Sequence, residues 1–217
     1  YAPTPPARAA RQVIRFGQTR QPSYAWSFDR GDGWCNVGYG ELLRPRRPAP
    51  TRALMLEEME ELLPGATSGA QSWLGHHLPL SPARWQQPDG RVLLAGDAAS
   101  LVNPLTGEGI YYAVATGALA GETAVRSACA QAGARHRARV RRLLGAHLLT
   151  TAAVSRVVHA RGVLPAGLRA ASADQAVFDE LVEVGLGRGL LSPRTVGRLL
   201  RQGAADVTSP RVPGSSR

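Results

Sequence analysis

The sequence contains no lysine and only two cysteines, and each shortage limits what the protein can be. All 26 basic residues among its 217 residues are therefore arginines, and they give a net charge of +10. We attribute the missing lysine to a GC-rich coding sequence, so the charge alone says little about an anionic partner. Cys35 and Cys129 are far apart, which predicts neither a disulfide framework nor a zinc site. Each is expected to be a small buried side chain.

Long apolar runs and targeting patterns are also missing. No apolar run approaches the ~20 residues needed to cross a bilayer, and no segment has the pattern of a signal peptide. We therefore expect a cytoplasmic protein whose membrane contact, if it has one, is peripheral. The densest basic cluster places Arg135, Arg139 and Arg142 on one predicted helical face. We interpret it as a solvated face first and a surface for anionic lipid second. No nucleic-acid partner is expected, because no aromatic residues interleave the cluster.

The first third of the chain has the pattern of an antiparallel sheet followed by a helix. Residues 12–16, 24–28 and 34–40 are strand candidates, and Asp29 to Gly33 between the last two is a hairpin turn. Residues 51–63 place Met55 and Met59 on one helical stripe, with Thr51 as a helix cap. We expect an antiparallel meander with this helix packed on its open face.

A second pattern joins an apolar run to a glycine-rich turn. The run Val92 to Ala95 is typical of a buried strand, and a helix is predicted over residues 110–130. The stretch Gly96 to Ile110 between them carries an acidic residue, Asp97, just before the helix begins. Ligands bind at such positions, because strand ends leave a crevice and the helix offers unpaired N–H groups.

The remaining residues are predicted to be helical. Helices are expected over 134–172, 173–187 and 192–202, with breaks at Leu164–Pro165 and Ser192–Pro193. The glycine-rich segment 185–189 lacks the strand-turn-helix context of a dinucleotide loop and is interpreted as a helix stop. The tail, residues 209–217, is expected to be disordered.

The glycine-rich stretch resembles the second flavin-binding motif of FAD-dependent oxidoreductases of the aromatic-hydroxylase and geranylgeranyl-reductase type. The resemblance implies that Asp97 binds a hydroxyl of the flavin's ribityl chain. It also implies that the turn after Pro104 directs a helix N-terminus at the isoalloxazine. The cofactor-binding residues that it implies are Gly96, Asp97, Pro104, Gly107, Glu108, Gly109 and Ile110.

The hairpin carries a second resemblance. Tyr24-x-Trp26-x-Phe28, followed by Gly38-Tyr39-Gly40, is similar to the Tyr-x-Trp-x-Phe-Pro…Gly-x-Gly signature of geranylgeranyl reductases. It implies that these aromatic residues, with Gly38 and Gly40, line a substrate cavity for an isoprenoid chain. The alternative is that the three rings only fill the core of the sheet. Asp29 stands where the family usually has proline, which puts the backbone of that turn in doubt.

The chain contains no Gly-x-Gly-x-x-Gly fingerprint for the pyrophosphate and adenosine of FAD. The resemblance therefore covers only the carboxyl-terminal half of the family's architecture, and we expect either a truncated chain or one half of a split protein. Its implied activity is FAD-dependent saturation of isoprenoid double bonds in a lipid, quinone or pigment precursor. The electron donor, reduced nicotinamide or ferredoxin, and the proton donor stay open. The alternatives are a flavin monooxygenase or halogenase, and a non-catalytic prenyl-lipid-binding or complex-forming half of a split flavoprotein.

These expectations define an α/β fold made of α+β pieces. Residues 1–88 would be a partial substrate-binding domain with an antiparallel sheet and the helix at 51–63. Residues 89–132 would be the carboxyl-terminal part of the FAD-binding domain, with its last Rossmann-like strand and a flavin-facing helix. Residues 133–208 would form a helical region, followed by the tail.

Overall fold

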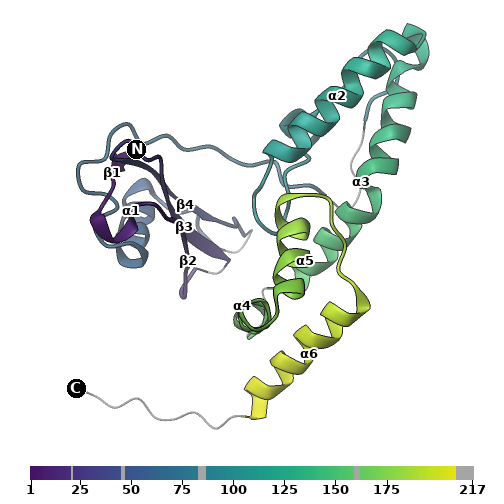
Figure 1. The fold of residues 1–217 in the computed structure, drawn as a ribbon. Coiled ribbons are helices and arrows are strands. Elements are labelled where there is room, and N and C mark those ends of the chain that lie inside the picture. The colour runs from purple at the N-terminus through teal and green to yellow at the C-terminus, as the bar shows by residue number, and fades with distance from the viewer. Residues whose placement is uncertain (21, 45–46, 83–86, 159–161, 209–217) are drawn as a thin grey trace, which may run out of the picture. The chain divides into compact units, whose positions relative to one another are not determined.

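A computed structural model describes residues 1–20, 22–44, 47–82, 87–158 and 162–208. In these ranges the protein is mixed α/β, with a four-stranded antiparallel sheet and six α-helices (Figure 1). The chain divides into two compact units, Tyr1–His76 and His77–Arg217. The sheet and helix α1 belong to the first unit, and helices α2 to α6 belong to the second.

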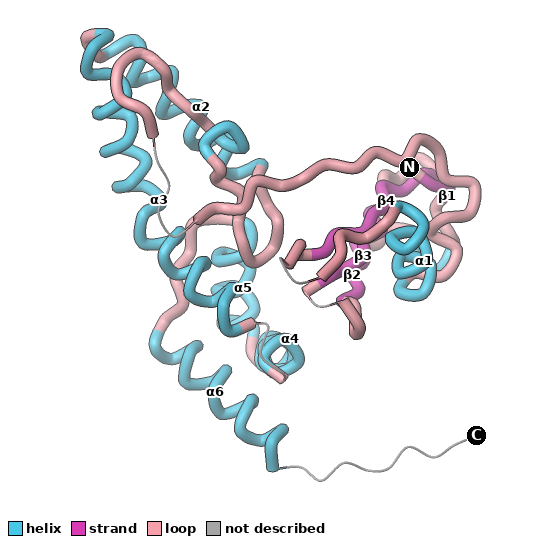
Figure 2. Tube along the Cα trace, turned by 180° about the vertical axis from the view of Figure 1, so that it is seen from behind, coloured by secondary structure: helices cyan, strands magenta, loops and turns pink. Residues whose placement is uncertain are grey.

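The sheet of the first unit has the strand order β1-β4-β3-β2 (Figure 2). Its strands are β1 (Ala2–Pro3), β2 (Gln12–Phe16), β3 (Ser23–Asp29) and β4 (Trp34–Glu41), and every pairing is antiparallel. The turn between β3 and β4 contains Gly31 and Gly33 at φ values of 80° and 84°, a region that glycine enters without steric cost. The predicted meander is confirmed, and β1 adds a short edge strand to it.

Helix α1 (Arg52–Leu62) closes one face of this sheet. The Thr51 hydroxyl accepts a hydrogen bond of 3.2 Å from the Leu54 amide, so the predicted cap is confirmed. Met59 and Leu63 are buried against the face of the sheet that carries Ala25 and Cys35. Successive side chains of a strand point to opposite faces, so the small residues of β3 enter this core and its aromatic residues lie on the other face.

The expected strand over Val92 to Ala95 is wrong. The segment belongs to no strand of the described chain, and the side chain of Val92 is 58% exposed. A strand needs a hydrogen-bonded neighbour, but here a side chain satisfies the backbone instead. The Gln87 carboxamide donates to the Val92 carbonyl and accepts from the Leu94 amide, at 3.0 and 3.2 Å. The segment therefore leads into the glycine-rich turn as an extended chain.

The second unit is built from helices. They are α2 (Ile110–Arg126), α3 (Ala132–Val157), α4 (Val163–Ala173), α5 (Gln175–Leu186) and α6 (Pro193–Thr208), with short 3₁₀ turns at Gly96–Ala99 and Cys129–Gln131. Helices α2 and α3 pack as a hairpin around Tyr112, Val140 and Leu144, and α4 packs against both α5 and α6. None of the helices in the described ranges is long and apolar enough to span a membrane.

The breaks between these helices follow the prolines and glycines of the sequence. Pro165 lies in the first turn of α4 and Pro193 opens α6, positions where the missing proline N–H costs no helical hydrogen bond. The Gly187 amide closes α5 on the Glu183 carbonyl, so the predicted helix stop is confirmed. The predicted disordered tail, residues 209–217, lies outside the described residues.

The two cysteines have different environments. Cys35 is fully buried in the sheet core, as expected, whereas Cys129 is exposed between α2 and α3. The expectation of burial is therefore wrong for Cys129. Its place in a short connecting turn, with no layer packed above it in the described chain, explains the difference.

Candidate functional site

The aromatic residues of β3 do not fill the core of their unit. Tyr24, Trp26 and Phe28 alternate with the buried residues Ser23, Ala25 and Ser27, and all three rings are only partly buried. They share the face of the sheet opposite α1, where Ile14 of β2 is 49% exposed beside Trp26. None of the three rings belongs to the core cluster between the sheet and α1. The first unit presents an apolar wall instead.

The two glycines of β4 leave room for the rings of Trp26 and Tyr24. Gly38 is the cross-strand partner of Trp26, and a Cβ placed on Gly38 would lie 2.2 Å from an atom of the indole ring. A Cβ on Gly40 would lie 3.7 Å from the ring of its partner Tyr24, an ordinary contact. The Trp26 indole N–H donates to the Asn36 carboxamide at 2.8 Å, which fixes the orientation of the ring. The spacing Gly38-x-Gly40 therefore has a steric cause. A side chain at position 38 would collide with the Trp26 ring, whereas one at position 40 would only touch the Tyr24 ring.

Asp29, which departs from the family's proline, closes the end of β3 with hydrogen bonds. Its carboxylate accepts from the Ala10 amide at 2.6 Å, the Thr4 hydroxyl at 3.0 Å and the Gly31 amide at 3.2 Å. These donors hold the pKa of Asp29 below its ordinary value, the Ala10 amide most of all. The carboxylate thus fixes the turn and ties it to the N-terminal segment.

The glycine-rich turn of the second unit begins at Gly96, which lies against α2. Its φ is 52°, and a Cβ there would lie 2.8 Å from the Ala113 Cβ. The Gly96 amide donates to the Thr116 hydroxyl at 3.0 Å. Only glycine combines this backbone conformation with so close an approach to a helix.

Asp97 is exposed directly after this glycine. Its Oδ1 lies 3.3 Å from the point that a Cβ on Gly109 would occupy, so the carboxylate stands over the residue that caps α2. Its side chain has no hydrogen-bond partner within the described ranges. It is therefore available to accept a hydrogen bond from a ligand hydroxyl.

The loop from Pro104 to Gly109 is held closed by Asn103. The Asn103 amide donates to the Glu108 carbonyl at 2.7 Å, and the Gly107 amide donates to the Asn103 carbonyl at 2.9 Å. The side-chain oxygen of Asn103 accepts from the Leu105 amide at 2.9 Å. Gly107 has a φ of 75°, so the turn at this position favours glycine.

The Glu108 side chain binds the first amides of α2, next to the N-cap residue Gly109. Its carboxylate accepts from the amides of Ile110 and Tyr111 at 2.6 and 3.3 Å, and a negative charge is favourable at the positive end of a helix. A ligand group that approached these two amides would have to displace the carboxylate. The structure thus places an acceptor at Asp97 and a second carboxylate at the helix end, two groups suited to the hydroxyls of a polyol.

A buried polar network supports the loop from below. Tyr112 and His147 are 0% and 2% exposed, and the Tyr112 hydroxyl lies 2.7 Å from His147 Nε2. Asn103 Nδ2 donates to the Tyr112 oxygen at 3.0 Å and to the Val184 carbonyl at 2.9 Å. Since a carbonyl can only accept, His147 Nδ1 donates to the Gly189 carbonyl at 2.8 Å and Nε2 then accepts from Tyr112 when the ring is neutral.

This network joins the loop to α3 and α5, and burial raises the pKa of Tyr112 to about 12, so its hydroxyl stays protonated at neutral pH. The spacing of residues in the sequence did not predict that Asn103 and His147 belong to this buried network. The available signal was their position, because each is a polar residue within an apolar stretch: Leu101 and Val102 precede Asn103, and Leu148 and Leu149 follow His147.

The residues predicted for the flavin thus come together in the second unit, from Gly96 to Ile110, and those predicted for the substrate come together on one face of the first. Pro104, Gly107 and Glu108 are partly buried in the loop, and Ile110 is exposed at the start of α2. The roles of both groups in binding a flavin or a prenyl chain stay predictions.

Comparison with known proteins finds relatives that are named as reductases. No family model and no solved structure matches the chain. A menaquinone reductase of Mycolicibacterium smegmatis is 38% identical over 105 residues, which is 46% of this chain and 26% of the relative. Digeranylgeranylglycerophospholipid reductase 1 of Methanopyrus kandleri is 37% identical over 122 residues, 53% of this chain and 31% of the relative.

A digeranylgeranylglycerophospholipid reductase of Methanothrix thermoacetophila is 36% identical over 100 residues, 46% of this chain and 25% of the relative. The matched part spans about a quarter to a third of the length of these curated relatives. These matches confirm the resemblance to the geranylgeranyl reductase family over about half of the chain.

Proposed function

We propose that the chain is the carboxyl-terminal portion of an FAD-dependent reductase that saturates isoprenoid carbon–carbon double bonds. The observation that carries the proposal is the partly buried aromatic face of β3, which lies opposite α1. Its rings are available as a wall because α1 and the core occupy the other face of the sheet. The names of the relatives, which are menaquinone and digeranylgeranylglycerophospholipid reductases, support a prenyl-chain substrate.

The second unit fits a flavin in part. The unpartnered Asp97 carboxylate can accept a hydrogen bond from a ribityl hydroxyl, and the absence of a side chain at Gly109 leaves room beside it. The first-turn amides of α2 fit less well, because Glu108 already binds them. We assign the sugar contact to Asp97, and we assign to Glu108 the task of keeping the loop and the start of α2 in place.

Each group of residues has a separate task in this reaction. A bound reduced flavin would supply the hydride for the alkene, and a proton from solvent or an acid would complete the hydrogenation. Tyr24, Trp26 and Phe28 bind the prenyl chain, exclude water from it and limit its orientations, which lowers the entropic part of the barrier. The Asn103–Tyr112–His147 network keeps the loop that carries Gly107 and Gly109 rigid.

The proposal is tested by supplying the missing dinucleotide-binding half. The chain is co-expressed with an adjacent reading frame that encodes a Gly-x-Gly-x-x-Gly domain. The purified complex is then reduced anaerobically with dithionite, to avoid assuming an electron donor. It is incubated with a menaquinone and with a digeranylgeranyl glycerolipid, and mass spectrometry reports the gain of two hydrogen atoms per reduced bond.

Hydrogenation without oxygen is the expected result. Oxygen-dependent hydroxylation or halogenation of an added substrate would replace the proposal by the monooxygenase or halogenase alternative. A stable, colourless complex that binds the prenyl lipid but transfers no hydrogen would replace it by the binding-module alternative.

A further inference from the structure

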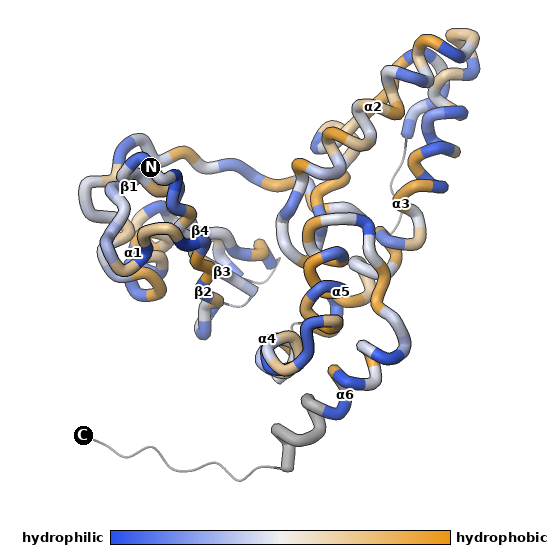
Figure 3. The backbone as a smooth tube through the Cα atoms, viewed as in Figure 1, coloured by the Kyte–Doolittle hydropathy of each residue, from blue (hydrophilic) through white to orange (hydrophobic). Residues whose placement is uncertain are grey.

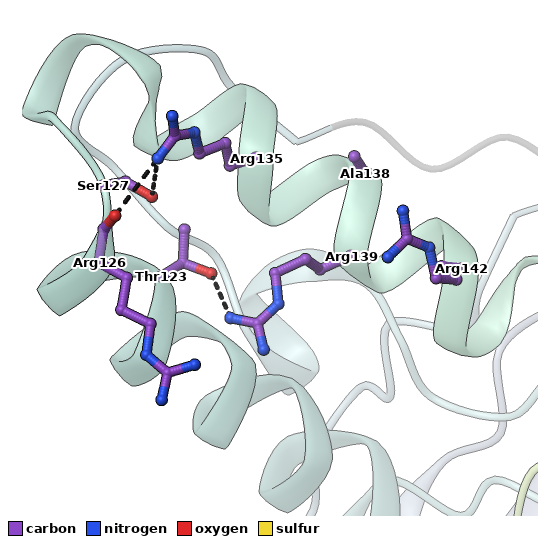
Figure 4. A pocket seen from close by; sticks show the side chains of 7 residues that line it. All are labelled: Thr123, Arg126, Ser127, Arg135, Ala138, Arg139 and Arg142. Carbon is purple, nitrogen blue, oxygen red and sulfur yellow. Dashed lines mark hydrogen bonds between the residues drawn. The ribbon is translucent and has the colours of Figure 1, made fainter.

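A basic cavity lies between α2 and α3, at the end of the hairpin away from the glycine-rich turn (Figure 4). Its volume is about 440 Å³, within the roughly 300–1,000 Å³ typical of small-molecule sites. The polar residues that line it are Arg126, Arg135, Arg139, Arg142, Thr123 and Ser127. A neighbouring cavity of about 350 Å³ shares Arg139 and Arg142 and adds Arg188. No acidic residue lines either one.

Two of the four arginines are held in place by the protein. Arg135 donates to the Arg126 carbonyl at 3.3 Å and to the Ser127 hydroxyl at 3.4 Å. Arg139 donates to the Thr123 hydroxyl at 3.0 Å and forms an ion pair with Glu122 of α2. These bonds orient two guanidinium groups before any ligand arrives, which lowers the entropic cost of binding.

Glu122, the acidic partner of Arg139, neutralises only part of the charge. The hydrogen bond from Arg139 holds the pKa of Glu122 below its ordinary value, so Glu122 is ionised at neutral pH. Four guanidinium groups less one carboxylate leave an excess of three positive charges around the cavity. Like charges so close together repel each other unless an anion lies between them.

The other two arginines are free to bind such an anion. The guanidinium groups of Arg126 and Arg142 make no hydrogen bond or ion pair within the described residues. Figure 4 shows them on opposite helices of the hairpin, with Arg139 between them and Arg135 beside Ser127 at the end of the hairpin. Arg139 can form the base of a site, and the two free groups can close on the ligand from either helix.

We propose that this cavity binds a phosphate group. Guanidinium is a planar fork of donors that matches phosphate oxygens in pairs, and several guanidinium groups can share a group of high charge. The ligand is a phosphate ester, either in the headgroup of an anionic lipid or in a free molecule such as a diphosphate. The proposal is independent of the proposed reaction, because the cavity shares no residue with Gly96–Ile110. It lies ~20 Å along α2 from that stretch, at 1.5 Å per residue.

Titration of the full 217-residue chain tests the site. Inorganic pyrophosphate is titrated at low salt by isothermal calorimetry. In parallel, the chain is sedimented with phosphatidylcholine vesicles that contain or lack phosphatidylglycerol. The test variant is R126Q/R142Q, which removes two guanidinium groups that form no internal bonds. The control is R141Q, which removes an exposed charge on α3 that does not line the cavity. R142K keeps the charge but removes the fork.

The double variant should lose about tenfold or more in affinity for the anion, R142K should be intermediate, and R141Q should stay within about twofold of the wild type. Binding of pyrophosphate alone would assign the site to free phosphate esters, and binding of phosphatidylglycerol vesicles alone would assign it to lipid headgroups. Equal losses in R141Q and R126Q/R142Q would overturn the proposal, because they would indicate general charge attraction. Absence of binding to both anions would also overturn it.

Discussion

The two compact units build their candidate sites in different ways. The aromatic wall of the first unit comes from neighbouring strands of one hairpin, so Trp26 and its partner Gly38 are twelve residues apart. The turn of the second unit depends on distant segments: Asn103 binds the Val184 carbonyl and Tyr112 binds His147. The first surface is therefore local, whereas the second exists only when three helices have packed together.

The difference also appears in what holds each site. The rings of β3 lie on one face of the sheet because strand geometry alternates side chains, and glycines opposite them leave the space. Helix α2, whose first residue Ile110 is the last of the glycine-rich stretch, is mainly apolar, whereas arginines interrupt the apolar residues of α3 (Figure 3). The second site is held by buried hydrogen bonds, each of which is costly to leave unpaired.

The largest effect should come from Asn103→Ala. This change leaves the Val184 carbonyl without its donor, takes one of two donors from the Gly185 carbonyl and removes the acceptor for the Leu105 amide. We expect a loss of about 3 kcal/mol in the free energy of unfolding of the second unit. Urea unfolding followed by the helical circular dichroism signal measures it.

Tryptophan fluorescence is the control for Asn103→Ala in a Trp85→Phe background, which also serves for the variants below, since Trp85 belongs to the second unit by its position whereas Trp26, Trp34 and Trp73 lie in the first. Its unfolding midpoint should stay unchanged. An equal shift of the fluorescence and helical midpoints would show that the two units do not unfold independently.

The next effect should come from Gly38→Ala. Its new Cβ would lie 2.2 Å from the Trp26 ring, and such overpacking costs about 1–3 kcal/mol. The fluorescence midpoint should fall while the helical signal keeps its own midpoint. Gly40→Ala is the matched control, because its Cβ would lie 3.7 Å from the Tyr24 ring and should cost less. Equal costs at the two glycines would contradict the steric account of the Gly-x-Gly spacing.

A smaller effect is expected from Tyr112→Phe. The change removes the hydroxyl between Asn103 and His147 but keeps the ring in its apolar contacts, so it should cost about 1–2 kcal/mol, less than Asn103→Ala. The helical signal measures this loss. A cost as large as that of Asn103→Ala would mean that the hydroxyl, and not Asn103, is the centre of the network.

The smallest effect concerns pH and Asp29. Its pKa is lowered in the folded state, so its stabilising contribution is present above the unfolded value of about 3.9 and is lost as the pH falls through the lower folded value. Asp29→Asn should lower the melting temperature of the first unit at neutral pH. It should also make this temperature fall less as the pH is lowered. Melting curves followed by tryptophan fluorescence between neutral and acidic pH check this. An unchanged acid dependence in the variant would contradict the assignment.

The sequence predicted most of what is local in this protein. The meander, the Thr51 cap, the shared face of Tyr24, Trp26 and Phe28, and the stop at Gly187 all follow from periods of two or 3.6 residues and from turn chemistry. What failed depends on partners far along the chain. Val92 to Ala95 has strand composition, but its backbone bonds to Gln87 and not to another strand. Asn103 and His147 could not be predicted from spacing, because the contact of Asn103 with Val184 crosses 81 residues and that of His147 with Gly189 crosses 42.

The most direct test of the central claim compares Asp97→Ala with Trp26→Ala in the complex completed by the dinucleotide-binding half. Flavin affinity is measured by the quenching of flavin fluorescence, and the hydrogenation of a prenyl substrate is measured in the same samples. Asp97→Ala should weaken flavin binding by roughly tenfold to a hundredfold, the value of a hydrogen bond to a charged group. Trp26→Ala should leave flavin binding unchanged and raise the KM for the prenyl substrate. The account would be contradicted if Asp97→Ala bound flavin as tightly as the wild type, or if Trp26→Ala left the prenyl KM unchanged.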